Sequence, residues 1–126
     1  MHHVEIYVGD LERSIAFWTP FMRHLGYEPD RWSGGMNYVK EGAAYFCFLP
    51  APLAEAGYHR QRIGLNHLAF RVPTRAQVDA VTDWVRSAGH TVLYEDRHPF
   101  AGGEHYYALF CEDPDRIKVE VVAEGE

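Results

Sequence analysis

Two histidines and one glutamate are the residues of this chain best suited to hold a metal ion. His3 and His67 each begin a short segment of alternating apolar residues, and Glu120 lies in a third such segment near the end of the chain. Two imidazoles and one carboxylate suit zinc, iron(II), manganese or nickel, with positions left for water or substrate. A structural site would normally use four ligands, often cysteines. These residue types therefore predict one divalent metal ion with a catalytic role, not a structural one.

Alternation along three predicted strands places these residues on faces that helices do not cover. Neighbouring side chains of a strand point to opposite faces, so a sheet covered by helices on one side shows an apolar residue at every second position. The apolar positions are Val4, Ile6 and Val8, then Leu68, Phe70 and Val72, then Val119 and Val121. The other positions gather His3, Glu5, Tyr7, His67, Arg71, Lys118 and Glu120. Alternation predicts a polar concave surface, but it does not show that the three ligands meet at one point.

The chain reads as two copies of one unit. The same 64 residues separate the two histidines and the starts of two predicted helices, at Leu11 and Arg75. A repeated order of strand, helix and three strands indicates two βαβββ modules, at about 1–50 and 64–124, joined by a connector at about 51–63 within a single domain 1–126. The predicted fold is α+β, with the modules forming a curled mixed sheet around a metal-binding cavity.

Capping and turn residues set the bounds of the predicted elements. Asp10 is suited to cap the first helix, and Pro20 within it predicts a break, with Thr19 capping a second short helical piece. The second helix has the form of a capping box at 74–77 and ends at Gly89. Further strands are predicted at 36–40 and 44–49 in the first half, and at 91–95, 105–111 and 117–122 in the second.

Composition excludes several classes of protein. The 126 residues are 47% hydrophobic, yet no apolar run approaches the roughly 20 residues of a membrane-spanning helix. A net charge of −6 with dispersed basic residues offers no surface for nucleic acid. Residues 1–20 lack a signal-peptide pattern, and Cys47 and Cys111 lie in apolar segments as buried thiols. We expect a cytoplasmic protein with no nucleic-acid or membrane partner.

Other residues are candidates for proton transfer and for contacts with a small-molecule substrate. The loop that contains Gly102 and Gly103 is typical of mobile segments that supply catalytic groups. The candidate acids and bases are Glu5, His105, Tyr106 and Tyr107. The candidate substrate contacts are Tyr7, Arg71, Lys118, Cys47 and Phe46. For each of these residues taken alone, a surface or packing role is an open alternative.

Three segments of the chain have the form of known family motifs. They are His2-His3-Val4-Glu5-Ile6-Tyr7-Val8 with the helix start that follows, Asn66-His67-Leu68-Ala69-Phe70, and Asp113-Pro114-Asp115 followed by Val119-Glu120-Val121. Together they resemble the vicinal oxygen chelate superfamily, which includes glyoxalases, bleomycin-resistance proteins and extradiol dioxygenases. The resemblance covers nearly the whole chain. It implies paired βαβββ modules around a metal, with His3, His67 and Glu120 at the ligand positions, and a homodimer.

The chain departs from glutathione-dependent glyoxalase I at one ligand position. Members of that type have a fourth ligand, usually a carboxylate, where this chain has Tyr45-Phe46-Cys47-Phe48-Leu49, which contains no acid. This departure argues against glyoxalase I, whereas the His-His-Glu triad of fosfomycin-modifying and ring-cleaving members is matched. The resemblance implies a lyase, isomerase or transferase that acts on a small oxygenated substrate chelated to the metal. Two alternatives stay open: an iron(II) dioxygenase of the extradiol type, and a metal-free protein that binds and sequesters a drug.

Overall fold

The computed structural model describes all residues, 1–126, and contains two helices and seven strands in two mixed sheets. The chain divides into two compact units, Met1–Gly57 and Tyr58–Glu126, and the division falls inside the predicted connector. The α+β fold class is confirmed. That the two units form one domain around a shared cavity remains a prediction. Neither helix is long and apolar enough to cross a membrane.

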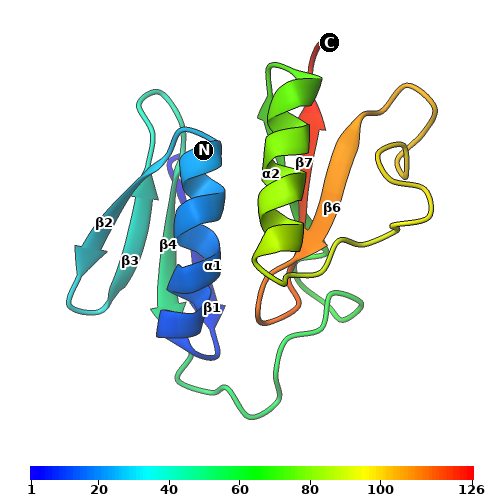
Figure 1. Cartoon of the computed structure of the whole chain (residues 1–126). Coiled ribbons are helices and arrows are strands. Elements are labelled where there is room, and N and C mark those ends of the chain that lie inside the picture. The colour runs from blue at the N-terminus through cyan, green and yellow to red at the C-terminus, as the bar shows by residue number, and fades with distance from the viewer. The chain divides into compact units, whose positions relative to one another are not determined.

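The first unit packs one helix on a four-stranded sheet. Its elements are β1 (His3–Val8), α1 (Leu11–His24), β2 (Glu28–Trp32), β3 (Gly35–Val39) and β4 (Tyr45–Pro50), and α1 lies along one face of the sheet (Figure 1). The strand order is β1-β4-β3-β2, with β1 and β4 parallel and the other pairs antiparallel. Trp18 of α1 is fully buried, and its ring centroid lies 4.6 Å from that of Phe48 in β4. This core leaves the opposite face of the sheet for the polar residues of β1.

Helix α1 runs without interruption through Pro20, so the predicted break is wrong. Proline lacks one hydrogen-bond donor, but the helix is held against the sheet on both sides of it by the fully buried Trp18 and Met22. Thr19 does not cap a second helix; its Oγ1 shares a 2.7 Å hydrogen bond with the hydroxyl of Tyr38. The predicted N-cap is confirmed, because the side chain of Asp10 accepts from the backbone N–H of Arg13 at 3.1 Å.

The second unit packs one helix on a three-stranded sheet. Its elements are β5 (His67–Val72), α2 (Arg75–Ser87), β6 (Ala108–Glu112) and β7 (Lys118–Ala123), in the strand order β5-β7-β6. Figure 1 shows β6 beside β7. β5 and β7 are parallel, whereas β6 and β7 are antiparallel. The capping box of α2 is confirmed, with Thr74 and Gln77 each bonding the other's backbone N–H. The buried stripe of α2 consists of Val78, Val81, Thr82 and Val85.

Two strand predictions differ from the structure. The strand predicted at 91–95 is wrong, because only an isolated bridge between Val92 and Cys111 forms there. Tyr94 has φ 56°, in the left-handed region, so the extended backbone ends after Leu93. β2 is missing from the prediction because its residues, Glu-Pro-Asp-Arg-Trp, are polar and include a proline. It lies at the edge of the sheet, where a proline is tolerated.

Candidate metal-binding and active site

The parallel pairing of β5 and β7 brings His67 and Glu120 to one face of the second sheet. Ala69 is the register partner of Glu120, and Lys118 is the register partner of His67. Directly opposed residues of paired strands point to the same face, and so do residues two apart along one strand. His67 and Glu120 are therefore diagonal neighbours on the face opposite the one that buries Val119 and Val121, as alternation predicts.

Glu120 is a buried carboxylate whose two oxygens have different partners. The residue is only 3% exposed. His67 Nε2 lies 3.2 Å from Oε2, and the hydroxyl of Tyr106 donates a short hydrogen bond to Oε1. Burying an ionised carboxylate is costly unless it is paired and hydrogen-bonded. The Tyr106 phenol hydrogen-bonds Oε1, and Oε2 faces the imidazole of His67.

The spacing of Nε2 and Oε2 fits two ligands of one divalent metal ion. Bonds of about 2.0–2.2 Å at angles between about 90° and 110° place two ligand atoms roughly 2.8–3.6 Å apart. The observed separation of 3.2 Å lies within that range. An imidazole nitrogen and a carboxylate oxygen are also suitable donors for zinc and for other borderline divalent ions. The donor atoms of this pair and their spacing would therefore fit two ligands of one such ion.

Tyr106 reaches Glu120 from the glycine-containing loop before β6. Its ring lies close to Gly102, where an added Cβ would come within 2.3 Å of Tyr106 Cδ1. The hydrogen bond to Glu120, and secondarily burial, raise the pKa of the Tyr106 phenol to about 12. At neutral pH the phenol is therefore protonated, which makes it a hydrogen-bond donor in this arrangement and a poor base.

In the first unit, His3 lies on β1 with a second acidic residue beside it. His3 Nε2 is 3.5 Å from Glu5 Oε2, and the His3 ring stacks on that of Tyr45 at a centroid distance of 4.7 Å. Cys47 is the register partner of Glu5, so its thiol shares this face. Burial, and then the charge of Glu5, raise the pKa of the Cys47 thiol. Tyr7, two residues beyond Glu5, is 62% exposed on the same side.

The remaining candidates of the second unit have separate surroundings. Lys118 Nζ donates to the hydroxyl of Tyr94 at 3.0 Å and lies over the ring of Phe110. Arg71 is exposed, and its guanidinium lies 3.8 Å from the carboxylate of Glu124. Of the candidate cations, only Lys118 is the direct cross-strand neighbour of His67.

Three other candidates have different surroundings within their own units. Tyr107 points to α2, where its hydroxyl donates to Asp79 at 2.5 Å. His105 is exposed in the loop before β6. Phe46 is 8% exposed and packs against Tyr27 on the helix-facing side of the first sheet, because it alternates with Tyr45 and Cys47 along β4. We therefore leave Phe46 out of the proposed site.

The sequence reasoning missed Asn66 as a site residue. Its Oδ1 lies 2.6 Å from Nδ1 of His67, on the opposite side of the ring from Glu120. Asn66 immediately precedes His67 in the segment that carries the resemblance, so the sequence did contain a signal for it. Hydrogen bonds to the second ring nitrogen commonly orient metal-binding histidines.

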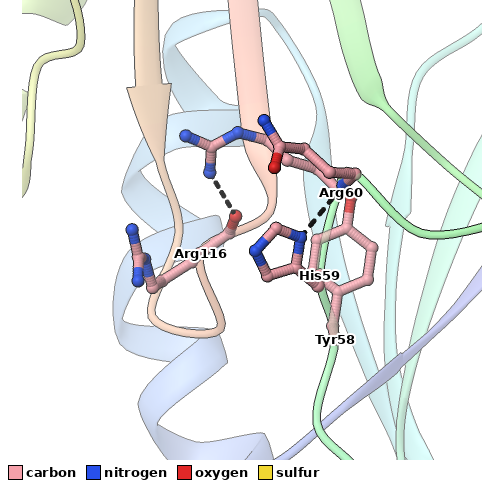
Figure 2. A pocket seen from close by; sticks show the side chains of 5 residues that line it. Tyr58, His59, Arg60 and Arg116 are labelled. Atoms are coloured by element: carbon pink, nitrogen blue, oxygen red, sulfur yellow. Dashed lines mark hydrogen bonds between the residues drawn. The ribbon is translucent and has the colours of Figure 1, made fainter.

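A surface hollow of about 220 Å³ lies next to this site in the second unit. It is lined by Tyr58, His59, Arg60, Gln61 and Arg116 (Figure 2). The guanidinium groups of Arg60 and Arg116 lie 3.6 and 3.1 Å from opposite oxygens of Glu112. Arg60 also donates to the backbone oxygen of Arg116 at 3.2 Å, as Figure 2 shows. These contacts fix the segment that leads into Asn66.

Comparison with known proteins places the chain in a family. Residues 1–121 match the Glyoxalase/Bleomycin resistance protein/Dioxygenase superfamily. The uncharacterized protein YqjT of Bacillus subtilis (strain 168) is 53% identical over 126 residues, which are 98% of each chain. The chain therefore belongs to this superfamily, whose members share the vicinal oxygen chelate fold.

Solved structures agree with that assignment. The crystal structure of a candidate glyoxalase from Bacillus halodurans is 52% identical, with a TM-score of 0.93, and the match covers 98% of this chain and 94% of that one. A glutamate-to-glutamine mutant of the fosfomycin resistance protein FosX from Listeria monocytogenes, in complex with Mn(II) and 1S,2S-dihydroxypropylphosphonic acid, is 23% identical. Its TM-score is 0.69, with 98% and 88% of the two chains covered, so it shares the fold.

Proposed function

We propose that this chain is a metal-dependent enzyme whose small substrate chelates a divalent metal ion through neighbouring oxygen atoms. His67 Nε2 and Glu120 Oε2 are two of the ligands, and His3 is the third, as the sequence predicts. The observation that carries the proposal is the 3.2 Å separation of Nε2 and Oε2 on a buried carboxylate. When bound, the metal supplies Lewis-acid stabilisation of negative charge on a substrate oxygen. The reaction class is a lyase, isomerase or transferase.

The residues around the ligands have distinct proposed roles. Tyr106 restrains Glu120 by donating to Oε1, so that Oε2 stays turned toward His67. Lys118, the cross-strand neighbour of His67, binds an anionic group of the substrate. Glu5, which lies beside His3, moves a proton during the reaction. The FosX complex supports an oxygen-rich anionic substrate, because it contains Mn(II) together with a phosphonate that has two neighbouring hydroxyl groups.

Elemental analysis of protein purified without chelators tests this proposal. The wild type is expected to contain about one equivalent of divalent metal per chain. His67→Ala and Glu120→Gln are both expected to lose it. Glu120→Gln is the sharper variant, because the amide oxygen of glutamine still accepts a hydrogen bond from Tyr106 while the negative charge is gone. His3→Ala tests the third ligand in the same way.

A matched histidine variant controls for nonspecific loss. His24 is exposed in the last turn of α1, so His24→Ala is expected to retain the metal of the wild type. A wild type that contains no metal, and takes none up when zinc, iron(II), manganese or nickel is added, would overturn the proposal. In that event the metal-free, drug-sequestering type of binding protein becomes the better account of the chain.

An iron(II) dioxygenase of the extradiol type is the second candidate. Two histidines and one carboxylate with open positions are the donor set of non-haem iron oxygenases. The metal found by elemental analysis separates the two candidates, together with oxygen uptake in the presence of catechols. Iron with oxygen consumption supports the dioxygenase, and a redox-inactive metal without it supports Lewis-acid chemistry. The homodimer and the cytoplasmic location stay predictions, and light scattering of the purified protein tests the first.

A further inference from the structure

We propose that Asn66 is a positioning residue that fixes which nitrogen of His67 faces the metal. The inference rests on the proposed function, since it concerns the second contact of a proposed ligand. It starts from hydrogen bonds that join Asn66 to Arg60 on one side and to His67 on the other. All of these residues lie in the second unit.

The orientation of the Asn66 amide follows from Arg60. Asn66 Nδ2 lies 3.4 Å from the backbone oxygen of Arg60, and a carbonyl oxygen can only accept a hydrogen bond. The NH2 group of the amide must therefore face Arg60. The reverse orientation would set two oxygen acceptors against each other. Consequently Oδ1 of Asn66 is the atom that faces His67, at 2.6 Å from Nδ1.

The Asn66 oxygen in turn determines the position of the hydrogen on His67. Because Oδ1 can only accept, Nδ1 of His67 must carry the hydrogen that bridges the 2.6 Å gap. A neutral imidazole has one N–H, so Nε2 then has a free lone pair. That lone pair points at Glu120 Oε2, 3.2 Å away. Two acceptors at this distance repel each other unless a proton or a metal ion lies between them, so a neutral His67 presents Nε2 and Oε2 as two free donors to a metal ion.

Side-chain contacts hold residues 58–66, the segment before β5, so that the Arg60 carbonyl can orient Asn66. The Arg60 guanidinium donates to the backbone oxygen of Arg116 (Figure 2). It also pairs with the carboxylate of Glu112 at 3.6 Å. The hydroxyl of Tyr58 donates to the backbone oxygen of Leu65 at 2.5 Å, which closes the segment on itself. The carbonyl that orients Asn66 is thus held by contacts to the turn between β6 and β7. This turn leads into β7, which carries Glu120.

Two substitutions of Asn66 test whether its acceptor for His67 Nδ1 affects zinc binding. Asn66→Ala removes the acceptor for Nδ1, and we expect its affinity for zinc to fall about 10- to 100-fold, as is common when the partner of a metal-binding histidine is lost. Asn66→Asp keeps an acceptor for Nδ1, although it adds a negative charge and replaces the donor to Arg60 with a second oxygen. We expect it to bind zinc within a few fold of the wild type. Zinc affinity is measured by competition with a chromophoric chelator, and thermal unfolding of the metal-free variants checks that they are folded.

The position of the hydrogen is measured directly by nitrogen-15 NMR of the histidine rings. At a pH where the imidazole is neutral, we expect His67 to carry its hydrogen on Nδ1 in the wild type and in Asn66→Asp, both with and without zinc. In metal-free Asn66→Ala that preference is expected to be lost. A wild-type His67 with its hydrogen on Nε2, or an Asn66→Ala variant that binds zinc as tightly as the wild type, would overturn the inference.

The two readouts keep this inference separate from the proposed function. If the wild type binds no metal, the proposed enzyme fails, and the NMR spectrum of the metal-free protein still decides whether Asn66 sets the state of His67. If zinc binds at His67 but the hydrogen lies on Nε2 in the metal-free protein, the enzyme proposal stands and the role of Asn66 is contradicted.

Discussion

At the scale of residues, the second unit surrounds one carboxylate with groups that complement it. Glu120 is almost fully buried, and leaving such a charge unpaired would cost several kcal/mol. Tyr106 satisfies Oε1, and the imidazole of His67 faces Oε2. The carboxylate therefore has one oxygen committed to the protein and one directed toward the proposed metal.

The titration of Tyr106 tests this arrangement. A carboxylate that accepts from a phenol favours its protonated form, so the pKa of Tyr106 is raised to about 12. In a titration followed by phenolate absorbance, the difference between the wild type and Tyr106→Phe is expected to show one group that ionises near pH 12. In Glu120→Gln its pKa is expected to move back toward 10.0, the ordinary value for tyrosine. A Tyr106 that ionises at its ordinary pKa in the wild type would contradict the hydrogen bond.

The alternation of side chains along a strand explains which site residues could be assigned to a sheet face from the sequence. The faces of His67 and Glu120 follow from their parity along β5 and β7, because apolar side chains take the alternate positions Phe70 and Val72 in β5 and Val119 and Val121 in β7. The same rule excludes Phe46 from the proposed site, since a residue between Tyr45 and Cys47 cannot share their face of the sheet. The contact of Tyr106 with Glu120 depends on the path of a loop, and no periodic pattern reports that path.

At the scale of elements, local signals predicted the helices better than the strands. The caps of both helices depend on a few neighbouring residues, and both formed as the sequence indicates. The break predicted at Pro20 is wrong because packing against the sheet outweighs one missing hydrogen bond. The segment at 91–95 has the composition of a strand, but the left-handed backbone of Tyr94 takes it away from the sheet after a single bridge.

Removing the N-cap of α2 is expected to destabilise the protein. Thr74→Ala deletes the side-chain acceptor for the backbone N–H of Gln77, and such caps contribute about 1 kcal/mol. Thr74→Ser is the matched control, because it keeps the hydroxyl and should lose little stability. Urea denaturation of the two variants measures the difference. Equal stability of the alanine and serine variants would show that the cap does not contribute.

Replacing the proline of α1 is expected to stabilise the protein. Pro20→Ala restores a backbone donor inside a continuous helix, and a proline in a helix interior costs up to about 3 kcal/mol relative to alanine. Proline also restricts the unfolded chain, which offsets part of that gain. We expect the free energy of unfolding to rise by about 1–2 kcal/mol in urea denaturation. A decrease would mean that the ring of Pro20 contributes packing that alanine cannot replace.

At the scale of the whole molecule, each unit has its own core and its own polar sheet face. Trp18 and Phe48 lie in the first core, and Val81 and Val121 lie in the second. The equal 64-residue spacing of the two histidines and the two helix starts predicted this duplication. Alternation assigns His3 to a face of the first sheet, but it does not show whether His3 meets His67 and Glu120.

Zinc is expected to stabilise the folded chain through the proposed site. A ligand that binds only the folded state, at a free concentration of 100 times its dissociation constant, raises the free energy of unfolding by about 2.7 kcal/mol. Urea denaturation with and without zinc should show this increase for the wild type and not for Glu120→Gln. The same increase in both proteins would place the bound zinc elsewhere.

Anomalous diffraction from crystals grown with zinc tests the central claim most directly. The account predicts one strong peak per chain, about 2.0–2.2 Å from both His67 Nε2 and Glu120 Oε2, with Nδ1 of His67 still directed at Asn66. The same map shows whether His3 completes the ligand set. A peak only at other residues, or no peak at saturating zinc, would contradict the account.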